Sequence, residues 1–192
     1  IGSPYIDAAV GSVNDHLVKR LLLFSRYRRS KGFEVIPKVI DELKKRDYRV
    51  EFHVTIEDQD YCRLFGDYSE YVINHGPINP AAGPDLYNGC DALFLPTYLE
   101  CFSASFPEAM RMKKPILTSD FPFTRSICGD AALYFDISTP SDIAEKIVLL
   151  FTNEDLRAEL IAKGEKRVAM FPDSRQQKDQ YLVLLRKLAQ EA

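Results

Sequence analysis

The stretch that decides the fold covers residues 20–55 and reads RLLLFSRYRRSKGFEVIPKVIDELKKRDYRVEFHVT. It opens with a continuous apolar run over residues 21–24, which is typical of a strand covered on both faces. Apolar side chains then recur at helical spacing from Val35 to Leu43, and residues 48–55 read as a second strand. A strand, a helix and another strand in this order form the crossover that parallel strands require. The stretch therefore predicts an α/β fold.

The alternation of strands and helices continues along the rest of the chain. Further strands are expected at residues 71–74, 92–95, 115–118 and 132–135, of which the first has the weakest pattern. We therefore predict a Rossmann-like, doubly wound, mostly parallel sheet of about six strands with helices on both faces. Ligands bind such sheets at the carboxyl ends of the strands.

The expected helices differ in how clearly their sequences mark them. Thr139-Pro140 has the capping residue and the first-turn proline that begin a helix, and Thr152 with Asp155 repeats that arrangement. A short helix is expected over residues 80–88. Residues 57–70 are polar with scattered aromatic side chains, and they indicate no more than a loop or a short helix.

The composition is that of a folded domain. The chain has 192 residues, 46% of them hydrophobic and 28% charged, with a formal net charge of -3. This charge provides no broad positive field for a nucleic-acid partner. The four cysteines lack the spacing of a zinc site or of a disulfide scaffold, and no signal peptide or membrane span is recognisable, which favours a cytoplasmic setting.

The loop after the first strand is basic. Arg26 and Lys31 lie between this strand and the next helix, where unpaired backbone N–H groups and the helix dipole favour an anion. An arginine can grip a phosphate through two hydrogen bonds, and a lysine adds a compact charge. The alternative is a solvated basic turn that binds no ligand.

Two carboxylates follow the fourth strand. Glu100 falls at the expected ligand edge, where it could accept hydrogen bonds from sugar hydroxyls, although it could also be an ordinary surface residue. Glu108 stands three residues after Ser105, which is also the spacing of a helix capping box. After the next strand, Ser119 or Asp120 is expected to cap a helix rather than to bind a ligand.

Several other enzyme classes lose support from the sequence. The three histidines are dispersed along the chain, and no serine lies in a nucleophile elbow. The first strand is followed by neither a dinucleotide-binding glycine motif nor a phosphate-binding P-loop. These patterns weigh against a hydrolase, a dinucleotide oxidoreductase and a P-loop ATPase.

Three motifs in register resemble one known family. These motifs are Arg26 followed by Lys31-Gly32, the pair Glu100 and Glu108 with seven residues between them, and residues 115–120 followed by 129–133. Together they resemble the carboxyl-terminal, donor-binding domain of retaining GT-B glycosyltransferases of family four, the glycosyl transferases group 1. The resemblance covers about residues 20 to 170.

The resemblance implies roles for individual residues. Arg26 and Lys31 would neutralise the donor diphosphate as it leaves, Glu100 would contact the sugar, and Glu108 would hold the ribose hydroxyls. The phosphate cradle would be completed by the backbone N–H groups of Phe102, Ser103, Ala104 and Ser105. The family uses no cofactor beyond its nucleoside-diphosphate-sugar substrate and usually needs no metal. The sequence departs from the family's glycines at Ser25, Cys101 and Ser103, which affects how closely the backbone can approach the donor.

The resemblance also implies a division of the chain and a set of partners. Residues 1–19 would be a linker or a remnant of an interdomain segment, residues 20–172 the nucleotide-sugar-binding domain, and residues 173–192 a terminal helix. In the family such a helix packs toward an amino-terminal acceptor domain, without which this hexosyltransferase-type domain would be inactive. The acceptor would be a glycan or a lipid-linked glycan, at the inner face of the membrane. The alternatives for the helix are pairing of two chains and packing onto this domain's own core.

Two other functions remain open at the level of sequence. A sugar-nucleotide epimerase of similar fold would share the diphosphate grip but act on the donor itself. A non-catalytic α/β binding module would use Glu100 and Glu108 only structurally.

Overall fold

The structure, a computed structural model, describes residues 4–7, 9–13 and 16–191 and contains one six-stranded parallel sheet. The strands are arranged in the order β3-β2-β1-β4-β5-β6. Their bounds are β1 Lys19–Leu23, β2 Val50–Val54, β3 Val72–Asn74, β4 Ala92–Leu95, β5 Ile116–Ser119 and β6 Ala132–Phe135. In register, Leu21 of β1 lies opposite Phe52 of β2 and Ala92 of β4. The chain winds outward from β1 in one direction and then from β4 in the other, which confirms the doubly wound α/β fold.

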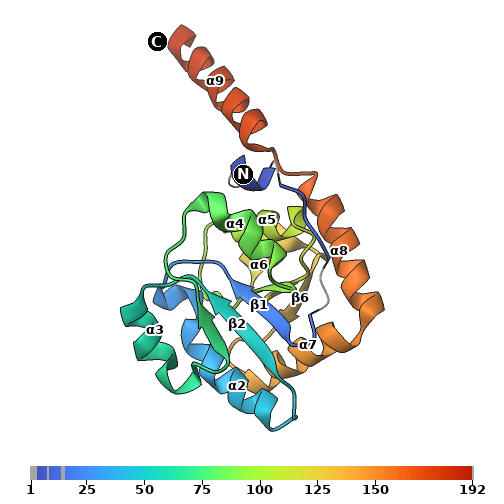
Figure 1. Cartoon of the computed structure of the whole chain (residues 1–192). Coiled ribbons are helices and arrows are strands. Elements are labelled where there is room, and N and C mark those ends of the chain that lie inside the picture. Colours follow the sequence, from blue (N-terminus) through green and yellow to red (C-terminus); the bar gives the residue numbers. More distant parts are fainter. Residues whose placement is uncertain (1–3, 8, 14–15, 192) are drawn as a thin grey trace.

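Helices cover both faces of this sheet (Figure 1). Right-handed crossovers place the helices of the two winding directions on opposite faces, and accordingly α2 packs against α7 whereas α5 packs against α8. The α-helices are α1 Pro4–Asp7, α2 Ile36–Lys44, α3 Asp58–Phe65, α4 Gly83–Asn88, α5 Ser105–Arg111, α6 Pro122–Cys128, α7 Pro140–Thr152, α8 Glu154–Val168 and α9 Ser174–Glu191. Short 3-10 helices are η1 Arg29–Lys31, η2 Phe33–Val35, η3 Gly66–Tyr68 and η4 Pro80–Ala82.

The core lies between the sheet and these two helical layers. Aromatic side chains from β2, β4 and β6 meet there, with Phe94 of β4 packed edge-on against Phe52 and stacked on Phe135. Such pairs stabilise a core beyond the area that they bury. The apolar runs of the sequence therefore became the buried strands that their composition predicts.

The first strand begins two residues earlier and ends one residue earlier than expected. It begins at Lys19 and ends at Leu23, so Phe24 already belongs to the loop at the carboxyl edge. Lys19 and Arg20 pair with Val50 and Glu51 of β2 although they are polar. They are only partly buried at the start of the strand, so hydropathy could not mark this end.

Residues 57–70, whose structure the sequence left open, form α3 and η3. Asp58 and Asp60 lie in the first turn of α3 and Arg63 in its last, which complements the helix dipole. Phe65 is buried at the end of the helix. The weak periodicity reflects a short helix that fully buries only this side chain, while Tyr61 and Leu64 pack against the core partly buried.

The cap expected at Thr152 is wrong. Thr152 ends α7, and its hydroxyl donates to the carbonyl of Val148 at 2.8 Å. The cap of α8 is Asn153, whose side chain accepts from the N–H of Leu156 at 2.9 Å. Thr139 does occupy the N-cap position of α7, but its hydroxyl donates to Asp136 at 2.9 Å instead of capping the helix.

The amino-terminal segment is bonded to the domain. Ile6 of α1 is buried, and α1 contacts α4 and α5. Further along, His16 Nδ1 lies 2.8 Å from an Asp91 oxygen, and the ammonium group of Lys114 donates to the carbonyl of Ser12 at 2.6 Å. Burial lowers the pKa of Lys114 to about 8. These contacts determine where the chain enters β1.

Helix α9 extends away from the rest of the domain (Figure 1). Its apolar side chains are exposed: Tyr181, Leu182, Val183, Leu184, Leu185 and Leu188. The alternative in which this helix packs onto the domain's own core is therefore wrong. None of the helices in the described part of the chain has the length and apolarity that a membrane crossing requires.

Candidate functional site

The loop after β1 approaches the loop after β4 at the carboxyl edge of the sheet. The approach depends on Gly32, which has φ of +67° and lies directly against Pro96. A Cβ atom at position 32 would lie 1.9 Å from the carbonyl oxygen of Pro96. Only glycine fits this conformation and this distance, and its fit brings Lys31 next to the residues that follow β4.

Lys31 and Glu100 form an ion pair across these two loops, between the ammonium group and Oε2. The two side chains are only 12% and 19% exposed. Charges withdrawn from water in this way interact more strongly than charges on an open surface. The structure thus joins one cation after the first strand with one carboxylate after the fourth.

Hydroxyl groups from three elements hold the β1 loop in place. Thr55, which directly follows β2, donates its hydroxyl to the carbonyl of Ser25 at 3.3 Å. Ser105 at the start of α5 donates to the carbonyl of Phe24 at 3.1 Å. After β4, the Thr97 hydroxyl and the Tyr98 N–H both donate to the carbonyl of Ser30, at 3.1 and 2.8 Å. The loop that carries the predicted cations is therefore anchored at both ends.

Arg26 is exposed at the start of the same loop and has no carboxylate partner within the described residues. It lines a cavity of about 210 Å³, together with Phe24, Ser25, Thr55, Pro77, Ile78 and Pro80. Lys31 and Glu100 do not line this cavity. The structure therefore brings together two of the three charged residues and places the third in a hollow formed by the ends of β1 and β2 and the loop after β3.

Glu108 is buried in the first turn of α5 and accepts a hydrogen bond from the hydroxyl of Tyr87 at 3.3 Å. Burial, together with the Glu108 carboxylate, raises the pKa of Tyr87 far above its ordinary value. The capping-box alternative is wrong, because the residue at the N-cap position is Ala104 and the Ser105 hydroxyl donates to Phe24. Glu108 faces the interior because α4 brings a buried tyrosine against α5.

The segment before α5 presents backbone donors. Among the hydrogen bonds of the described residues, none is donated by the N–H groups of residues 102–105. The next donors are already used, since Phe106 N–H bonds to the carbonyl of Ser103 and Glu108 N–H to that of Ala104. Ser103 and Ser105 are buried, and the ring of Phe102 packs edge-on against Phe171. This segment can offer consecutive N–H groups to an anion.

Ser119 and Asp120 do not cap α6, contrary to the expectation from sequence. The N-cap residue is Phe121, whose N–H donates to the Thr124 hydroxyl at 3.1 Å. Asp120 instead pairs with Arg125, which holds the pKa of that carboxyl below its usual range. Ser119 is buried and donates its hydroxyl to the carbonyl of Thr97. The bond of Ser119 to the loop after β4 and the ion pair of Asp120 with Arg125 therefore outweigh the capping preference.

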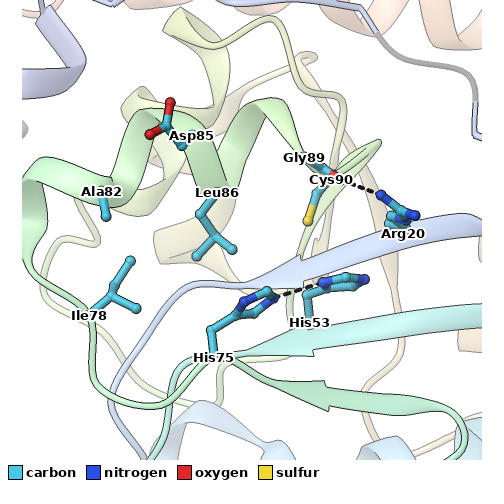
Figure 2. Close-up of a pocket in the computed structure, with 9 residues that line it drawn as sticks. All are labelled: Arg20, His53, His75, Ile78, Ala82, Asp85, Leu86, Gly89 and Cys90. Carbon is cyan, nitrogen blue, oxygen red and sulfur yellow. Dashed lines mark hydrogen bonds between the residues drawn. The ribbon is translucent and has the colours of Figure 1, made fainter.

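A second cavity, of about 340 Å³, lies between β1, β2 and α4 (Figure 2). His53 Nδ1 and His75 Nε2 are 2.9 Å apart at its base, and the two rings stack. Opposite them are the apolar side chains of Ile78, Ala82 and Leu86, and none of the predicted site residues lines this cavity. Burial lowers the pKa of both histidines, and for His53 the neighbouring His75 lowers it further.

Sequence reasoning missed this histidine pair because its members are 22 positions apart. They meet because β2 and β3 are neighbours and His53 lies opposite Ile73, two residues before His75. Within the residues that the structure describes, no group of three or more histidine, cysteine or acidic side chains could hold a metal ion.

Comparison with known proteins gives one family and several structural relatives. The family model described as Glycosyl transferases group 1 matches residues 13–167. The capsular polysaccharide biosynthesis glycosyltransferase CapM of Staphylococcus aureus is 26% identical over 160 residues, which are 81% of this chain and 39% of CapM.

Two solved structures are similar in fold. The carboxyl-terminal domain of the glycosyl transferase group 1 family protein LpcC from Francisella tularensis has a TM-score of 0.66 at 20% identity, covering 85% of this chain and 87% of that one. Anabaena HepE, solved in complex with UDP and glucose, has a TM-score of 0.74 at 16% identity, covering 88% and 48%. The chain spans less than half the length of CapM and HepE.

Proposed function

The chain belongs to the glycosyl transferases group 1 family, and from this premise we propose that it binds the donor in a transfer of sugar from a nucleoside-diphosphate sugar to an acceptor. Its parallel sheet is the Rossmann-like half of a GT-B fold. The single observation that carries the proposal is the ion pair of Lys31 with Glu100. It lies between the loops of β1 and β4, where the two winding directions of the sheet diverge and ligands of such sheets bind.

The two charges of this pair match the two parts of the donor that take part in transfer, the diphosphate and the sugar. Lys31 neutralises the phosphate charge that grows as the sugar departs, and Glu100 accepts hydrogen bonds from the sugar hydroxyls. In the donor-free chain the two side chains neutralise each other. Donor binding exchanges part of this ion pair for contacts with phosphate. The positive charge of Lys31 is therefore neutralised both with and without the donor.

The neighbouring features accommodate the rest of the donor. Arg26 reaches the diphosphate from the rim of its 210 Å³ cavity, which receives part of the nucleoside. The N–H groups of residues 102–105 complete the phosphate cradle. Glu108 holds the ribose hydroxyls by releasing its bond from Tyr87. These donors supply the positive charge that the leaving group needs, so we propose that transfer proceeds without a metal. Retention of the anomeric configuration is proposed from the resemblance to the retaining family alone.

The relatives support a proposal for the acceptor and for a second half of the enzyme. CapM is a glycosyltransferase of capsular polysaccharide biosynthesis, and we assign this chain a glycan or lipid-linked acceptor at the inner face of the cytoplasmic membrane. An amino-terminal domain holds that acceptor, so the isolated chain binds the donor without transferring it efficiently. In the intact enzyme, transfer would continue in the presence of EDTA, and NMR of the product would show the donor's anomeric configuration.

Calorimetric titration with UDP, GDP and ADP tests donor binding, with UDP first because HepE was solved with UDP. Lys31→Ala and Arg26→Ala are each expected to weaken binding about tenfold or more, because each removes a charge-assisted contact. Arg28→Ala is the matched control, since it removes the same charge from an exposed position of the same loop. Equal losses in all three variants would indicate a solvated basic turn, and no binding to the folded chain would contradict the proposal.

A further inference from the structure

The hydroxyl of Thr97 lies between the backbones of the two residues that form the ion pair. It is within hydrogen-bond distance of the carbonyl of Ser30, at 3.1 Å, and of the carbonyl of Leu99, at 3.4 Å. Ser30 directly precedes Lys31, and Leu99 directly precedes Glu100. One side-chain group thus touches the backbone on both sides of the ion pair.

Thr97 is itself held firmly. Its side chain is fully buried, and its N–H donates to the carbonyl of Leu95 at 2.9 Å. Its own carbonyl accepts from the hydroxyl of Ser119, and the carbonyl of Ser119 accepts from Thr124 at 2.7 Å. Ser119 and Thr124 are also fully buried. This chain of hydroxyl groups connects α6 and β5 to the two loops of the candidate site.

We propose that Thr97 is a positioning residue, which fixes Lys31 and Glu100 relative to each other through the carbonyls of Ser30 and Leu99. The inference rests on the proposed donor-binding function. The direct ion pair loosens when a diphosphate engages Lys31, so a separate anchor is needed to keep the cation and the carboxylate in place. Gly32 allows the loops to approach, and Thr97 sets their separation.

The test compares affinities for UDP, measured by calorimetry, in variants that differ in one hydroxyl group. Thr97→Val keeps the size and branching of the side chain and removes the donor, so affinity should fall roughly fivefold, the usual effect of one hydrogen bond. Thr97→Ser keeps the hydroxyl and should bind nearly as well as the unaltered chain. Thr118→Val is the matched control, because the Thr118 hydroxyl is equally buried and donates to the carbonyl of Leu95 at 2.9 Å. It should lower the melting temperature but leave affinity unchanged.

A double-mutant cycle separates positioning from a general loss of stability. If Thr97 acts through Lys31, Thr97→Val should have little further effect on affinity in a Lys31→Ala background. If Thr97→Val does not fold, Thr97→Ser and Thr97→Ala provide the comparison, since both lack the methyl group and differ only in the hydroxyl. Thr97→Ala should then bind about fivefold more weakly than Thr97→Ser.

The possible results separate this inference from the proposed function. Equal losses in Thr97→Val and Thr118→Val, or a Thr97 effect that adds fully to that of Lys31→Ala, would overturn the inference and leave donor binding intact. Absence of UDP, GDP and ADP binding to the unaltered, folded chain would overturn both.

Discussion

Gly32 shows at the scale of one residue how a backbone position can decide the geometry of a site. Its φ of +67° is a backbone conformation that residues with a Cβ atom rarely adopt, and a Cβ atom there would also overlap the carbonyl of Pro96. Gly76 has the same φ of +67°, but no atom lies within 4 Å of the position of its Cβ. The two glycines therefore separate the effect of backbone conformation from the effect of close packing.

Substitution of these two glycines should have unequal consequences. Gly76→Ala should cost about 1 kcal/mol of unfolding free energy, because only the left-handed conformation is strained. Gly32→Ala should cost about 2 kcal/mol or more and should also weaken UDP binding, because the loop carrying Lys31 must move away from Pro96. Urea denaturation and calorimetry measure both effects. Equal destabilisation by the two substitutions would contradict a role of this close approach in stability.

Glu100 is the residue at which the binding hypotheses differ most clearly. Replacement by glutamine keeps the shape of the side chain but removes its charge, leaving Lys31 partly buried without a carboxylate. We expect Glu100→Gln to change the affinity for a UDP-sugar several-fold relative to its effect on UDP, because only the sugar contacts Glu100 directly. Comparison of the two affinities by calorimetry is the measurement. Unchanged affinity for both ligands would favour a binding module in which Glu100 has only a structural role.

At the scale of secondary-structure elements, the pairing of β2 with β3 creates the contact between His53 and His75. Their pKa values lie below the ordinary 6.5 because burial disfavours the protonated form. Glu51 opposes this shift at His53, whereas Arg20 adds to it. A group whose folded-state pKa is depressed contributes stability above its unfolded pKa and loses it as the pH falls through the folded value. The pair should therefore favour the folded state above pH 6.5 and destabilise it progressively below.

The lowered pKa values of the two histidines predict a measurable pH dependence of stability. We expect the unfolding free energy of the chain to decrease from pH 7.5 toward pH 5.5, as measured by urea denaturation. In the double variant His53→Gln, His75→Gln the decrease should be smaller, since neither glutamine titrates. His16→Gln is a comparison at a partly exposed histidine that pairs with Asp91 instead of another histidine. A slope that is identical in the double variant and the unaltered chain would rule out the assigned role of the pair.

At the scale of the whole molecule, α9 is the element that the domain does not bury. Leu184 and Leu185 are 52% and 61% exposed, whereas Leu160 of α8 is only 5% exposed. Under the proposed function, we expect the apolar face of α9 to pack against an amino-terminal half. The helix would then contribute more to the contact between the halves than to the stability of this domain.

Substitutions on α9 should leave the domain stable. Leu184→Lys and Leu185→Lys should each change the unfolding free energy by less than about 0.5 kcal/mol, as exposed positions usually do. Leu160→Ala should cost about 2 to 5 kcal/mol, because it opens a cavity in the core. Thermal and urea denaturation report these differences. A loss at Leu184 comparable to that at Leu160 would show that α9 packs onto the domain in solution.

Local patterns in the sequence were enough to predict the alternation of strands and helices, the doubly wound sheet and the edge at which Lys31 and Glu100 lie. Hydrophobic periodicity, turn residues and charge placement are properties of short segments, so they can be read before the chain is folded. The helix N-caps were predicted less accurately. Ser119 and Ser105 donate to the carbonyls of residues far away in the sequence, and local spacing does not reveal such bonds.

The contacts within the site depend on residues far apart in the chain. Lys31 and Glu100 are separated by 69 positions, Thr97 and Ser30 by 67, and Tyr87 and Glu108 by 21. Whether such groups meet is decided by strand register, by the path of each crossover and by the close approach at Gly32. The sequence therefore predicted the edge of the sheet at which Lys31 and Glu100 lie, whereas the packing of β1 against β4 determined which side chains meet there. Atomic contacts depend on ångström-scale positions that no local pattern specifies.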